Sequence, residues 1–224
     1  EWIEWEHLRR TVTADACLPK NALRAKGDSM ASSLINLAEP FFLKILHLIS
    51  HPAPDSHGLE KMQRELLADI NAMESRVVSG KASVSSEDWQ FGKRPLIYWA
   101  DEVMTRHAPD WENIALEPVI YGETERAWKF YVEGEKCLQI GNNQVAEIYY
   151  LAIVLGFDKG DISWAFRHLG RSLPQGATDE DAARKHWARE LQMKIQHDSM
   201  ESLQCEPLQV NCEPRPDRKF AQVR

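Results

Sequence analysis

Apolar side chains recur at steps of three and four residues along most of the chain between residues 31 and 200. This spacing gathers them on one face of an α-helix. The clearest example is the run Leu59, Met62, Leu66, Ile70, Met73 and Val77. Segment 31–50 is apolar on most sides and therefore predicts a buried helix, which Pro40 should bend or restart.

The same spacing predicts further helices downstream. They cover 96–107, 112–121, 125–138, 145–157, 162–173 and 183–195. Pro95 suits the first turn of the helix over 96–107. The β-branched residues of 145–157 would also suit a strand, but the length of the segment and its helical steps favour a helix. Since no convincing strand pair and no solenoid repeat is visible, we predict an all-α protein of seven or eight helices.

Three regions follow from where this periodicity begins and ends. Residues 1–30 mix polar, charged and apolar side chains, which predicts a peripheral arm. Residues 31–200 are predicted to form a helical domain, and residues 201–224 are predicted to form an extended tail. The tail carries four basic residues, Arg215, Arg218, Lys219 and Arg224. Basic residues are typical of cytoplasmic segments next to a membrane helix, so we expect the natural chain to continue into an apolar span of ~20 residues.

The composition of the chain indicates which kind of molecule it binds. The 224 residues carry a formal net charge of -7, with 43% hydrophobic and 27% charged residues. An acidic surface repels nucleic acid and anionic lipid, so a protein partner with basic patches is the better expectation. The four cysteines, Cys17, Cys137, Cys205 and Cys212, form no CxxC pair, which favours a reducing cytosolic setting.

Motifs for catalysis are absent from the sequence. It contains no Walker loop, dinucleotide fingerprint, GxSxG elbow or HExxH pair. His47 and His51 are four residues apart, but Pro52 follows and no nearby ligand completes a metal set. We therefore expect no enzyme activity, cofactor or metal. A helical metal-dependent hydrolase and a free-standing helical adaptor are the alternatives.

An ordered set of segments between residues 96 and 160 resembles the DotU family, called TssL in type VI secretion systems and DotU or IcmH in type IVB systems. These segments are YWADEVM (98–104), Trp111, AWKFY (127–131), EIYYLAIVLGF (147–157) and Gly160. The apolar run PFFLKILHLI (40–49) stands where the family has its first long helix. The resemblance covers roughly residues 30–175.

The resemblance implies a cytoplasmic domain of two small helical bundles in a hook shape, followed by one C-terminal membrane helix that lies beyond this chain. It implies a non-enzymatic scaffold on the cytoplasmic face of the bacterial inner membrane. Such a scaffold links the inner-membrane complex to the baseplate, with a TssM/IcmF-type membrane protein and baseplate proteins as partners. A second copy of the chain, forming a homodimer, is a further possible partner.

Five residues are candidates for the interaction site: Asp101, Glu102, Glu147, Gly156 and Phe157. Asp101 and Glu102 are adjacent on a helix, so their side chains point about 100° apart and do not converge as a catalytic pair would. In one interpretation, one carboxylate is solvated and the other forms a salt bridge. In the other interpretation, which rests on the resemblance, the pair forms an acidic docking site. Glu147 lies in an apolar helix and should face solvent or pair with Arg167 or Arg126.

Overall fold

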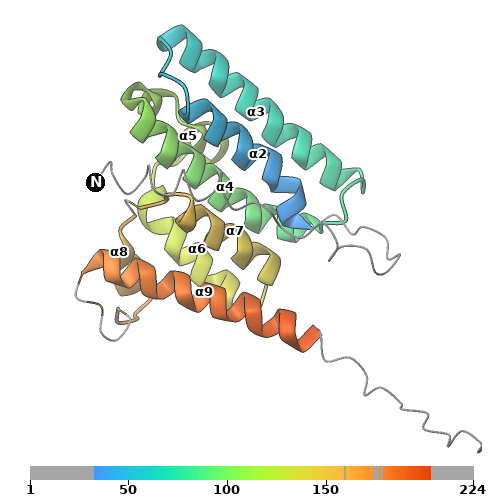
Figure 1. Ribbon diagram of the computed structural model, residues 1–224, viewed down its shortest axis with the longest axis vertical. Coiled ribbons are helices and arrows are strands. Elements are labelled where there is room, and N and C mark those ends of the chain that lie inside the picture. Colours follow the sequence, from blue (N-terminus) through green and yellow to red (C-terminus); the bar gives the residue numbers. More distant parts are fainter. Residues whose placement is uncertain (1–32, 159, 174–176, 178, 203–224) are drawn as a thin grey trace, which may run out of the picture. The chain divides into compact units, whose positions relative to one another are not determined.

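The computed structural model describes residues 33–158, 160–173, 177 and 179–202, and helices joined by turns and loops make up this part of the chain (Figure 1). It contains no strand, which confirms the all-α prediction. The helices are α2 (Leu34–Ile49), α3 (Ser56–Val78), α4 (Ser86–His107), η1 (Pro109–Ile114, a 3-10 helix), α5 (Leu116–Tyr121), α6 (Arg126–Ile140), α7 (Asn143–Val154), α8 (Ile162–His168) and α9 (Glu180–Ser202).

Short polar side chains fix where several helices begin. The Asp55 carboxylate accepts a hydrogen bond from Gly58 N at 2.8 Å, and the Ser85 hydroxyl accepts one from Asp88 N at 2.9 Å. Such caps satisfy backbone N–H groups that the first turn of a helix leaves without partners. Asn142 caps α7 in the same way, because its side-chain oxygen accepts a hydrogen bond from Val145 N at 3.2 Å.

The predicted start of α4 is wrong by about ten residues. The helix begins at Ser86, because Ser85 caps it and two acidic residues in its first turn favour the positive end of the helix dipole. Pro95 therefore lies inside the helix, where it is buried. Pro40 also lies inside α2, which continues past it without restarting.

Two further predicted boundaries differ from the structure. The segment expected as one helix over 112–121 is a 3-10 helix followed by α5, with Ala115 in an extended conformation between them. The helix expected over 162–173 ends at His168, and Gly170 follows with a positive φ of 65°. The helix expected over 145–157 is confirmed as α7, which ends at Val154, three residues earlier than predicted.

Helix α4 is the centre of the core. It packs against α2, α3, η1, α5, α6 and α7, and α7 in turn packs against α9 (Figure 1). The buried apolar side chains form one connected cluster that runs from Leu34 in α2 to Leu191 in α9. The core therefore joins the helices of the described part of residues 31–200 into one packed unit.

Helix α9 is held to α6 by an aromatic cluster. Trp187 lies against Phe130, Tyr131 and Tyr149, with ring centroids 5.1–6.2 Å apart. Gly134 of α6 makes room for this indole, because a Cβ atom there would lie 2.7 Å from Trp187. The position needs glycine for close packing.

The terminal regions are covered only in part. The arm predicted for residues 1–30 lies outside the described residues, and of the tail predicted for 201–224 only Glu201 and Ser202, the end of α9, are described. None of the helices that the structure describes is both long and apolar enough to cross a membrane.

Candidate docking site

Asp101 is buried where α4, η1 and α5 meet, and its side chain is 0% exposed. Its carboxylate accepts three hydrogen bonds, from Trp111 Nε1 at 2.9 Å, Leu116 N at 2.8 Å and Glu117 N at 2.7 Å. The last two are N–H groups at the start of α5, which Asp101 caps from a distance in the sequence. A carboxylate enclosed in this way offers no atom to a partner, so the structure gives Asp101 a structural role instead.

Arg126, the first residue of α6, joins three carboxylates. Its guanidinium lies 2.7 Å from Glu112, 3.4 Å from Glu117 and 3.9 Å from Glu102. Glu117 is fully buried, and burial raises its pKa, while Arg126 and a hydrogen bond from Glu125 N at 2.6 Å oppose that rise. The Arg126 hydrogen bond lowers the pKa of the exposed Glu112. This network fixes η1, α5 and α6 against α4.

A second arginine ties the end of α4 to the turn after α7. The Arg106 guanidinium donates to the Gly156 carbonyl and lies 3.0 Å from the exposed Asp158 carboxylate. Gly156 has a φ of 105°, a left-handed conformation that glycine adopts without strain. Phe157 is buried and stacks on Phe130, with ring centroids 3.9 Å apart.

We call Glu102, Glu112 and Asp158 the acidic rim. Its members surround the last turns of α4, where Thr105 donates to Glu112 at 3.2 Å and Arg106 binds Asp158. Glu112 and Asp158 are exposed, whereas the Glu102 side chain is largely covered. The rim therefore presents negative charge from a frame that two arginines hold in place.

The structure separates the five predicted site residues into different roles. Glu102 belongs to the rim and Gly156 contacts Arg106 beside it, whereas Asp101 and Phe157 are buried and therefore cannot contact a partner in this conformation. Sequence reasoning missed Glu112 and considered Arg126 only as a partner of Glu147. Nothing in the local sequence links them to Glu102, because that link depends on how η1 and α5 fold back onto α4.

Glu147 lies on the outward side of α7 and is half-buried. It does not pair with either expected base: Arg126 binds the network above, and Arg167 donates to the Ser163 carbonyl. Burial alone raises the pKa of Glu147, since no charged or hydrogen-bonding group among the described residues acts on it.

The pKa shift of Glu147 predicts how stability depends on pH. A carboxyl whose pKa is raised by folding stabilises the protein below its ordinary pKa, and that stability is lost as the pH rises through the folded value. Glu147→Gln should therefore be more stable than the wild type at pH 7, by less than about 1 kcal/mol, with the difference falling towards zero near pH 4. Urea unfolding at both pH values measures this, and a constant difference would contradict it.

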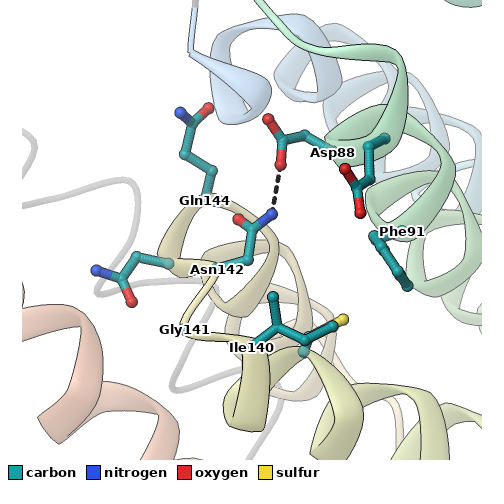
Figure 2. A pocket seen from close by; sticks show the side chains of 9 residues that line it. Asp88, Phe91, Ile140, Gly141, Asn142 and Gln144 are labelled. Atoms are coloured by element: carbon teal, nitrogen blue, oxygen red, sulfur yellow. Dashed lines mark hydrogen bonds between the residues drawn. The ribbon is translucent and has the colours of Figure 1, made fainter.

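A hollow of about 570 Å³ opens beside the first turn of α7 (Figure 2). Phe91, Cys137 and Ile140 give it apolar walls, and Asn142 donates to Asp88 on one side. Glu87 also lines it, and no partner of Glu87 is found among the described residues. The hollow therefore combines an apolar surface with negative charge.

Among the residues that the structure describes, no group of three or more His, Cys, Asp or Glu side chains is arranged to hold a metal ion. His47 and His51 lie side by side on the surface, with ring centroids 4.5 Å apart, and His51 Nδ1 lies 2.8 Å from the His47 carbonyl oxygen. Cys137 is buried with a free thiol.

The fold and the sequence were compared with those of known proteins, and a solved structure and a family model matched. The cytoplasmic domain of TssL from Acinetobacter baumannii has a similar structure, with a TM-score of 0.58 and 16% sequence identity over 74% of this chain and 98% of that chain. At this identity the likeness concerns the fold alone. No match was found among curated proteins. The model of the family described as type VI secretion system protein DotU matches residues 33–199, about three quarters of the sequence, and the chain therefore belongs to the DotU family.

Proposed function

We propose that this DotU-family protein is a non-enzymatic scaffold that docks other secretion-system subunits through the acidic rim. The observation that supports this most directly is the exposure of Glu112 and Asp158 on a frame fixed by Arg126 and Arg106. Rigid presentation of charge favours binding, because less conformational freedom is lost when the partner arrives. Complementary charge also speeds the encounter with a basic partner.

The partners expected from the family are a TssM/IcmF-type membrane protein and baseplate proteins, and the protein would link the two at the cytoplasmic face of the inner membrane. An acidic rim suits a basic surface on either class of partner. A helical hydrolase and a free-standing adaptor remain the alternatives, and the described residues offer no converging ligand set that favours the first.

Removing the exposed rim charges tests this function. The double variant Glu112→Gln and Asp158→Asn should bind a purified partner subunit about tenfold more weakly, with the effect shrinking at high salt. Binding of each partner is measured by surface plasmon resonance at 50 and 300 mM salt.

Two further measurements make this test specific. Glu60→Gln and Asp181→Asn on α3 and α9 remove exposed charges elsewhere and should leave binding unchanged. The rim variant must also melt as a folded helical protein, which circular dichroism checks. If the folded rim variant binds every partner as the wild type does, the rim is not the docking surface.

A further inference from the structure

Helix α7 has one face that no other described helix covers fully. Its inward residues Val145, Ala146, Ile148, Tyr149 and Ala152 are buried. The opposite face carries Gln144, Glu147, Tyr150, Leu151 and Val154, which are half-buried or exposed. At 100° per residue these five positions span about 120° of the helix circumference. We call them the α7 surface.

The α7 surface is mostly apolar at its centre and its end. Tyr150 and Leu151 are half-buried, and the Val154 side chain is 56% exposed. Helices α2 and α9 both contact α7 (Figure 1). The exposed strip lies on the side of α7 away from its buried residues. From Gln144 to Val154 the strip is about 15 Å long, the length of three helical turns.

Glu147 gives this surface a charge preference. It is the one charged residue of α7, and its pKa rises through burial with no cation acting on it. A charge that is partly removed from water without a partner is unfavourable, and an incoming cation would offset that cost. The hollow at the start of α7 is lined by Glu87 and by the exposed Ile140. It therefore combines a negative and an apolar group, as the α7 surface does.

We propose that the α7 surface binds an amphipathic helix of a partner subunit, which places a lysine or arginine against Glu147 and apolar side chains against Leu151 and Val154. An amphipathic helix presents anchors three and four residues apart, and Glu147, Leu151 and Val154 follow the same steps along the strip. The proposal rests on the scaffold function above but uses a different surface from the acidic rim.

Photo-crosslinking from Val154 tests where a partner lies. A photo-reactive benzoylphenylalanine replaces Val154 in one variant and Val119 in a control, because these valines are 56% and 57% exposed on different helices. The probes are the cytoplasmic part of the TssM/IcmF-type protein and each baseplate protein, purified separately. We expect position 154, and not 119, to crosslink to a helical segment with a basic residue flanked by apolar ones.

A charge exchange then tests the role of Glu147. Glu147→Lys should weaken binding of the crosslinked subunit about tenfold or more, and changing the facing basic residue of that subunit to Glu should restore it. Glu147→Gln should have a smaller effect in the same direction. Val119→Lys is the control for added surface charge and should leave affinity unchanged.

The outcomes separate the two proposals. If a probe binds the wild type but position 154 gives no crosslink, or the crosslinked segment is acidic, the α7 surface is not a docking site and the rim proposal stands. The same conclusion follows if Glu147→Lys binds with unchanged affinity. If no probe binds the folded wild type at all, both the scaffold function and this inference are overturned.

Discussion

Replacing Asp101 with asparagine should lower the free energy of unfolding by about 2–4 kcal/mol. The carboxylate accepts from Trp111 Nε1 and Leu116 N on one oxygen and from Glu117 N on the other. An asparagine amide has one accepting oxygen, so its NH2 group must face an N–H donor. That buried donor then has no partner, and the start of α5 loses half of its distant cap.

Urea unfolding followed by circular dichroism at pH 7 measures this loss. Asp158→Asn is the matched control, because Asp158 is exposed and its ion pair with Arg106 should contribute less than about 1 kcal/mol. If Asp101→Asn unfolds like the wild type but no longer binds a partner subunit, Asp101 belongs to a docking surface after all. The burial seen here would then describe only the unbound state.

Asp101 shows what the sequence can and cannot reveal about a site. The pair Asp101–Glu102 was a candidate docking site because of the resemblance to the DotU family, in which an Asp-Glu pair ends an apolar helix. Which of them faces inward depends on the Trp111 indole of η1 and on two backbone N–H groups of α5, which lie 15 and 16 residues further along the chain. No local pattern encodes a contact of that kind, so the inward carboxylate could not be distinguished from the outward one.

The helices themselves were more predictable, because their apolar spacing reports burial directly. Segment 145–157 illustrates this: its steps favoured a helix over a strand, and α7 covers most of it. The largest error in a helix boundary arose at a proline. Pro95 was expected to begin a helix, yet the Ser85 cap outweighs it and the helix continues through the proline. A buried proline inside a long helix is a case in which packing overrides a local preference.

Glu147 shows that a sequence pattern also cannot reveal whether a surface carboxylate finds a basic partner. Its place in an apolar helix led to the expectation that it faces solvent or pairs with a base, and the structure gives a half-buried carboxylate without such a base. A sequence pattern records which residues share a face, but not whether a cation from elsewhere in the fold reaches that face. The three-dimensional structure supplies that information and turns an ordinary surface residue into a candidate anchor.

Replacing Trp187 with alanine should lower the free energy of unfolding by about 3–5 kcal/mol, as is usual for the loss of a large buried aromatic side chain. The indole is 0% exposed and fills the space above Gly134. It also donates a hydrogen bond from Nε1 to the buried Glu135 carboxylate at 2.6 Å. Alanine therefore leaves both a cavity and a buried carboxylate with one partner fewer, Arg171.

Trp187→Phe separates these two losses. Phenylalanine keeps much of the aromatic volume but cannot donate to Glu135, so its cost should be about 1–3 kcal/mol, lower than that of alanine. Trp164→Ala removes a partly exposed indole and should cost less than Trp187→Ala. Urea unfolding of all three variants orders the effects. If Trp187→Ala were no more destabilising than Trp164→Ala, α9 would not be anchored to α6 and α7 by this side chain, and the connected core would have to end before α9.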